Sequence, residues 1–144
     1  MLEVHLIVGV TVLASNLIAG AWGAYCWYAR RPSVGFWYLL RVAQVAVVVQ
    51  VALGGILLLE GRENIEGIHY VYGVLPILVA LLAEGARITA SDHEMQGLDF
   101  DALPRERQRA VALAITRRET GIMAVSALVI LGLALRAYFT SPIS

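Results

Sequence analysis

Two histidines, His5 and His69, each stand near the start of a long apolar segment, and each is followed four residues later by a glycine. Residues four apart share one face of an α-helix, so His5 aligns with Gly9 and His69 with Gly73. Imidazole ligates haem iron and other transition metals, and a glycine leaves room for a flat group against the helix. The spacing therefore predicts a site for a planar metal cofactor at the ends of two helices.

The composition places these histidines in a membrane protein. The chain has 144 residues, 59% of them hydrophobic, and a mean hydropathy of +0.72. Four apolar segments, at about 2–28, 36–59, 68–86 and 121–138, each approach the roughly 20 residues that a helix needs to span a bilayer. They occupy most of the chain. The sequence therefore predicts a single domain over residues 1–144, an all-α, integral membrane, up-and-down four-helix bundle.

The arginines predict how this bundle is oriented. Nine fall on one side of the expected membrane, and only Arg62 and Arg136 fall on the other. The positive-inside rule then puts both termini outside and the connections at 29–35 and 87–120 in the cytoplasm, in the cytoplasmic membrane of a bacterium. Within the second connection, residues 105–118 mix apolar residues with arginines. We expect one short amphipathic helix there, lying along the inner membrane surface between helices 3 and 4.

Polar residues inside the apolar segments need partners. Gln44 and Gln50 in the second segment cost free energy in hydrocarbon unless they bond within the bundle. Glu84 and Arg87 are three residues apart and can pair near the cytoplasmic interface. On the first segment, a stripe of small and polar residues is expected to face protein or cofactor and not lipid: His5, Gly9, Val12, Asn16, Gly20 and Gly23.

The expected topology puts both histidines at the same depth. Helices 1 and 3 run parallel and lie on a diagonal of the bundle, with axes about 13 Å apart when neighbouring axes are 8 to 10 Å apart. Imidazole, iron and imidazole together fill about this span, whereas a bare zinc ion would leave a gap. The predicted cofactor is one haem b per chain, with His5 and His69 as axial ligands. A histidine near a membrane interface is also a common polar anchor, and spacing alone leaves that alternative open.

Further residues fit the same cofactor. Gly54 and Gly55 on the second helix permit close approach of a flat ligand. The haem propionates would project outward, where Arg62 and Arg136 are placed to bind them with charge-assisted hydrogen bonds.

Several runs of the sequence resemble one half of a haem A synthase, a membrane enzyme built from two related four-helix bundles. Gln50 to Gly55 (QVALGG), followed by Glu60 and Gly61, is similar to that family's glutamine and Gly-Gly helix, and this similarity implies that Gln50 contacts the cofactor. The run 65–69 (IEGIH) resembles its Glu-x-x-His segment, and the His-Leu pair at 5–6 resembles the start of the last helix of each half. The helices here stand in rotated order.

The resemblance implies roles for particular residues. His5 and His69 would be the axial ligands of one haem, and Glu66 would match the family's catalytic glutamate. Tyr70 stands where the family has arginine, the outer loop at 61–64 lacks the cysteine pair of many members, and only one half is present. A homodimer would recover the arrangement with two bundles.

Three functions follow as hypotheses. The first is a b-type haem protein that transfers electrons or handles haem on the outer side, with quinone as an electron partner. The second is a haem A synthase-like oxidoreductase that oxidises haem and acts as a dimer. The third is a cofactor-free accessory subunit of a larger membrane complex. The sequence has no Gly-rich phosphate loop and no exterior basic patch, which argues against nucleotide or nucleic-acid chemistry.

Overall fold

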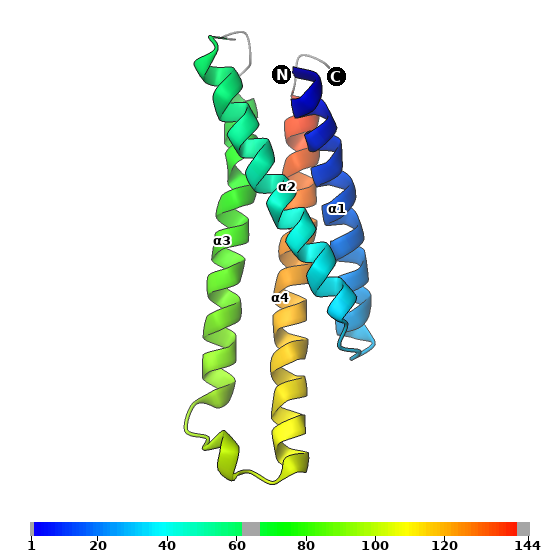
Figure 1. The fold of residues 1–144 in the computed structure, drawn as a ribbon, viewed down its shortest axis with the longest axis vertical. Coiled ribbons are helices and arrows are strands. Elements are labelled where there is room, and N and C mark those ends of the chain that lie inside the picture. Colours follow the sequence, from blue (N-terminus) through cyan, green and yellow to red (C-terminus); the bar gives the residue numbers. More distant parts are fainter. Residues whose placement is uncertain (1, 62–66, 141–144) are drawn as a thin grey trace.

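The computed structural model describes residues 2–61 and 67–140. They form four long helices, α1 (Leu2–Tyr28), α2 (Val34–Leu59), α3 (Gly67–Met95) and α4 (Arg105–Phe139), and one short 3₁₀ turn, η1 (Phe100–Ala102). The helices run alternately up and down, with the start of α1 and the end of α4 at the same end of the molecule (Figure 1). All four are long and apolar enough to cross a membrane. The described residues therefore confirm the predicted all-α class and the presence of four long apolar helices.

The four helices form a ring in chain order. α1 packs against α2 and α4, and α3 packs closely against α4 and more loosely against α2. α1 and α3 are therefore the diagonal pair, as the sequence predicts. This arrangement makes the inner face of each helix available to one shared interior.

The turn between α1 and α2 is held by local hydrogen bonds. Arg30, with φ of 54°, adopts the left-handed conformation that ends α1, and the Arg31 N–H donates to the Cys26 carbonyl at 2.9 Å. This is the Schellman arrangement of a helix C-terminus. Ser33 then begins α2, since its hydroxyl accepts from the Phe36 N–H at 3.2 Å and from the Trp22 indole at 3.0 Å. The same serine thus caps one helix and ties it to the other.

The prediction of a separate surface helix at 105–118 is wrong. Residues 105–139 form one continuous helix of 35 residues, about 52 Å long at 1.5 Å per residue. The first helix breaker after Arg105 is Gly121. This glycine stands where α4 packs closely against α1, because a Cβ added there would come within 2.8 Å of the Trp27 indole nitrogen. With no residue to stop it, the helix runs straight from the connection into the spanning segment.

The third helix also exceeds its predicted bounds. α3 continues to Met95 and ends before Gly97, whose φ of 75° is left-handed. The connection between α3 and α4 is therefore 96–104 and not 87–120. In consequence α3 and α4 form a hairpin that projects beyond the turn between α1 and α2 (Figure 1).

The interior is built from small side chains. The buried positions of α1 are Val12, Asn16, Ala19, Gly20, Gly23 and Cys26. They confirm that the predicted stripe faces the protein. Cys26 is a free, buried thiol. Alanines of α2, α3 and α4 meet this face, so the helices approach closely; Phe36, Leu40 and Met123 are also buried, while many other large apolar side chains point outward. Outward-facing apolar residues are what a lipid environment requires.

Replacing Gly23 by alanine should destabilise the bundle. A Cβ at this position would overlap the Phe36 ring and lie 2.9 Å from the Ala124 Cβ. Overpacking of this kind costs about 1 to 3 kcal/mol. Thermal unfolding in detergent, followed by circular dichroism, measures the loss. Gly85→Ala is the matched control, because a Cβ there meets nothing within 4 Å, and it should leave the midpoint unchanged or raise it. Equal midpoints for the two variants would contradict the close packing.

Candidate functional site

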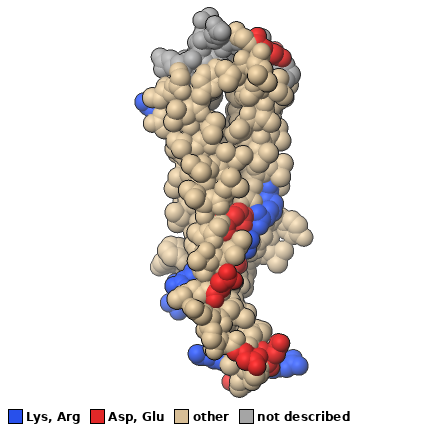
Figure 2. All heavy atoms as spheres, turned by 90° about the vertical axis from the view of Figure 1, so that its left-hand side faces the viewer, with Lys and Arg blue, Asp and Glu red and all other residues tan. Residues whose placement is uncertain are grey.

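A cavity of about 330 Å³ opens between the helices near the end that carries both termini. Figure 2 shows the surface hollowed near this end. Its volume falls in the range typical of small-molecule sites, and its walls are mostly apolar. All four helices contribute. The lining includes seven of the residues predicted as ligand or cofactor contacts: His5, Gly9, Gln50, Gly54, Gly55, His69 and Gly73.

The two histidine rings lie close together in this cavity. His5 is in the first turn of α1 and His69 in the first turn of α3, so both project from helix starts at the same end of the bundle. Their ring centres are 6.4 Å apart and their planes are inclined by 56°. The two histidines, which belong to diagonal helices, therefore lie near each other in the fold.

His69 is oriented by the end of α4. Its Nδ1 lies 3.0 Å from the Ala137 carbonyl oxygen, to which it donates as the Nδ1–H tautomer. This hydrogen bond leaves the lone pair on Nε2. A backbone carbonyl bonded to one nitrogen is the usual support for a histidine that binds metal through the other nitrogen. Sequence reasoning did not identify Ala137, because a backbone acceptor leaves no trace in residue type.

His5 is oriented by Gln50 of α2. The Gln50 amide nitrogen lies 3.1 Å from His5 Nε2, and this contact gives the glutamine the partner that its place in an apolar helix demands. Among the described residues, His5 Nδ1 and Gln50 Oε1 are buried and have no hydrogen-bond partner. Buried polar atoms are normally paired. These two atoms are thus unsatisfied polar groups of residues that line the cavity.

The glycines of the site play different parts. A Cβ at Gly55 or Gly73 would meet nothing within 4 Å, and one at Gly54 would meet His5 Cε1 at 3.5 Å. These three leave space along the cavity wall. Gly9 was predicted to leave room for the cofactor, but it faces the Gln50 side chain. A Cβ added at Gly9 would lie 3.2 Å from the Gln50 amide nitrogen. Gly9 thus makes room for Gln50.

Of the remaining predicted residues, the structure describes Arg136, which lies next to the cavity. The Arg136 guanidinium lies 6.0 Å from the centre of the Tyr72 ring, and Tyr72 lines the cavity. The arginine is thus close to the site without lining it. Arg62 and Glu66, the other predicted propionate partner and the predicted catalytic glutamate, lie outside the described residues.

A bare metal ion fits this donor set poorly. Within residues 2–61 and 67–140, no group of three or more His, Cys, Asp or Glu side chains is placed to hold a metal. Transition metals bound directly by protein usually take three or four side-chain ligands. Two imidazoles would suffice for a haem iron, whose other four ligands come from the porphyrin.

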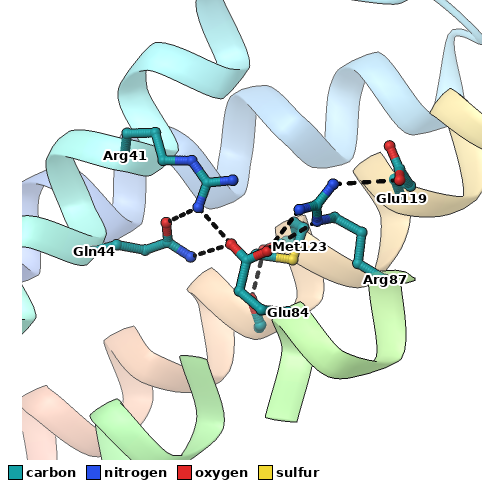
Figure 3. Close-up of polar contacts among 7 residues, drawn as sticks. Arg41, Gln44, Glu84, Arg87, Glu119 and Met123 are labelled. Carbon is teal, nitrogen blue, oxygen red and sulfur yellow. Dashed lines mark hydrogen bonds and ion pairs between the residues drawn. The ribbon is translucent and has the colours of Figure 1, made fainter. Parts of the chain in front are cut away.

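A charged cluster lies deeper in the bundle, toward the end with the turn between α1 and α2. Glu84 of α3 accepts hydrogen bonds from Arg41 and Gln44 of α2 and from Arg87 one turn on (Figure 3). Arg87 also donates to Glu119 of α4 at 3.3 Å. The predicted pair of Glu84 and Arg87 is confirmed, with 2.9 Å between Arg87 Nη2 and Glu84 Oε2. The participation of Arg41 and Glu119 was not predicted.

This cluster is self-contained. Its two arginines and two glutamates balance in formal charge, and the Arg87 guanidinium also lies 5.6 Å from the centre of the Trp37 ring. The cluster contains three ion pairs: Arg41 with Glu84, Arg87 with Glu84, and Arg87 with Glu119. It therefore joins α2, α3 and α4 as a structural unit and leaves the cavity as the candidate site.

Comparison with known proteins gives no match. No protein-family model, no curated protein and no solved structure matches this chain significantly. The resemblance to haem A synthases thus rests on the quoted residues alone.

Proposed function

We propose that this chain binds one haem b between His5 and His69, as a b-type cytochrome in electron transfer or haem handling near the outer face of the membrane. The observation that carries the proposal is the separation of 6.4 Å between the two ring centres across the cavity. Metal bonds to imidazole nitrogen are about 2 Å long. The nitrogen lies about 1 Å from the ring centre when ring bonds are about 1.3 Å. Two axial imidazoles on one iron therefore have centres about 6 Å apart.

The hydrogen bonds of the two histidines support the same assignment. His69 keeps Nε2 free because Nδ1 is bonded to Ala137. For His5, ligation through Nε2 requires the Gln50 amide to turn away from the ring. That rotation is available, since Gln50 is a flexible side chain whose Oε1 has no partner within the described chain. The cavity beside both residues offers the space.

Two imidazole ligands favour electron transfer over oxygen binding. When bound, a haem with both axial positions filled supplies a one-electron couple and offers no open coordination site. The residues of this chain would hold the macrocycle in an apolar cavity, orient both imidazoles and keep water away from them. One haem near one face does not carry electrons across a bilayer, so the proposal includes a membrane quinone or a partner protein as electron donor or acceptor.

The orientation belongs to the same proposal. Nine of the eleven basic residues lie toward the end opposite the cavity, and this end is placed in the cytoplasm by the positive-inside rule. The cavity and both termini then face outward.

The absorbance spectrum of the purified protein tests the proposal. We expect a Soret band and the sharp visible bands of low-spin, six-coordinate haem, and the extracted haem should be unmodified haem b. Haem with an oxidised side chain would favour the haem A synthase-like enzyme, with Glu66 in a catalytic role and a dimer as the working unit. A protein that stays colourless after haem supplementation would refute haem binding and favour an accessory subunit.

Filling the cavity from α3 should reduce haem binding. Gly73 lines the cavity, and a Cβ there projects into open space, so a Gly73→Leu side chain would occupy volume that the macrocycle needs. We expect at least a severalfold lower haem-to-protein ratio, measured by pyridine haemochrome. Gly132→Leu is the control, because Gly132 is exposed on α4, outside the cavity lining, and an added Cβ meets nothing within 4 Å. Equal haem content in both variants would argue against this cavity as the site.

A further inference from the structure

A second recess lies at the opposite end of the bundle, between the turn that joins α1 to α2 and the first half of α4. Its volume is about 220 Å³. It lies outside the haem cavity and the charged cluster, and shares no residue with either. The residues that line it are Cys26, Arg30, Arg31, Pro32, Leu113, Ala114, Thr116, Arg117 and Thr120.

The recess carries three uncompensated positive charges. Arg30, Arg31 and Arg117 line it, and no aspartate or glutamate does. None of these three guanidinium groups forms an ion pair or a side-chain hydrogen bond with another described residue, whereas Arg41, Arg87 and Arg118 are each paired with a glutamate. Like charges brought together without a counter-charge repel each other. A bound anion would relieve that repulsion.

The turn holds two of these arginines in place. Arg30 occupies the left-handed position of the Schellman turn, with φ of 54°, where glycine is the favoured residue. Arg31 follows directly, and its backbone N–H is bonded to Cys26. Both arginines line the recess together with Arg117 of α4. The basic groups thus come from two separate segments of the chain and converge on one recess.

The recess lies at the depth expected for a membrane surface. Exposed aromatic residues stand at the end of α1 and in the first turns of α2, the helices that the turn joins, with Trp27 45%, Tyr28 85% and Tyr38 72% exposed. Exposed tryptophan and tyrosine are typical of the level of lipid headgroups. Leu113, which is 44% exposed, adds an apolar edge to the recess.

We propose that this recess binds a phosphate group, the chemistry shared by an anionic phospholipid headgroup and free phosphate. Guanidinium groups bind phosphate oxygens through paired, charge-assisted hydrogen bonds, and basic pockets between membrane helices are typical headgroup sites. The site is independent of the haem cavity and stands without it.

Retention of lipid by the full chain tests the proposal. The protein is reconstituted in vesicles of equal phosphatidylcholine and phosphatidylglycerol, extracted in mild detergent, and its bound lipids are counted by native mass spectrometry. The recess variant is Arg30→Gln with Arg31→Gln and Arg117→Gln. The control is a triple variant that removes the same number of positive charges from exposed arginines of α4 outside the recess. It combines Arg105→Gln, Arg107→Gln and Arg109→Gln.

The wild type and the control should retain phosphatidylglycerol in preference to phosphatidylcholine, and the recess variant should lose that preference by roughly tenfold or more. Circular dichroism checks that the variants are folded. Arg117→Gln alone, an exposed change in the middle of a helix, serves as a second variant that leaves the turn intact and should show a partial loss. Equal loss in the recess and control variants, or unchanged retention in both recess variants, would overturn the lipid site.

Inorganic phosphate distinguishes the two sources of the phosphate group. Protein in detergent is heated with sodium phosphate or with sodium chloride at matched ionic strength. A midpoint raised by phosphate in the wild type but not in the recess variant, without any lipid preference, assigns the site to free phosphate. Lipid preference with no effect of phosphate assigns it to a headgroup. If neither ligand distinguishes the recess variant from the control, the proposal is wrong.

Discussion

Replacing His69 by alanine should abolish the low-spin haem spectrum of the purified protein, and His5→Ala should do the same. Each substitution removes one of the two imidazoles whose ring centres lie 6.4 Å apart across the cavity. An iron left with one protein ligand becomes five-coordinate and high-spin, or is lost because the affinity is too low. Visible absorbance, normalised to protein concentration, measures either outcome.

The third histidine supplies the control for this experiment. His93 is exposed in the last turn of α3, far along the helix from the cavity, and His93→Ala should keep the full spectrum. A second check uses His69→Gly with imidazole in the buffer, which should restore the low-spin bands by filling the vacated position. Low-spin spectra that survive in both His5→Ala and His69→Ala would refute the axial assignment.

Replacing Glu84 by alanine should cause the largest loss of stability among single changes in the bundle. Glu84 accepts hydrogen bonds from three side chains on two helices, Arg41, Gln44 and Arg87. Its removal leaves two arginines without their shared counter-charge. Breaking such a partly buried network costs about 2 to 4 kcal/mol. The measurement is thermal or denaturant unfolding in detergent, followed by circular dichroism.

A second ion pair of the same type provides the comparison. Arg118 donates to Glu94 at 2.6 Å; this glutamate is 33% exposed and bonds to one side chain, whereas Glu84 is 25% exposed and bonds to three. Exposed pairs contribute at most about 1 kcal/mol. Glu94→Ala should therefore lower the unfolding midpoint much less than Glu84→Ala. A cluster without structural importance would give similar shifts for both variants.

Much of the site could be predicted from the sequence. Apolar runs near the spanning length located all four helices, and the spacing of four between His5 and Gly9, and between His69 and Gly73, put these residues on shared helix faces. Alternation of helix direction then placed both histidines at one end. The same periodicity predicted that the small and polar residues of α1 face the protein and that Glu84 pairs with Arg87. Both features are present in the structure.

Other features depended on how the helices pack. Whether Gln50 meets His5 depends on the rotation of α2 about its axis and on Gly9 being small enough to admit the amide. The carbonyl that orients His69 belongs to Ala137, 68 residues away, and carries no side-chain signature. The continuous helix at 105–139 was missed because an amphipathic pattern predicts a helix without saying whether it bends onto the membrane or continues.

The sequence by itself determined which residues lie on each helix face and at which depth, because helical periodicity and hydrophobic length are local properties of the chain. Only the tertiary structure decided which faces meet, since interhelical contacts depend on rotation, crossing and backbone groups that no local pattern encodes. The histidine pair was thus predictable as two residues at matching depth. Its separation and its hydrogen bonds arise only when four helices close around one cavity.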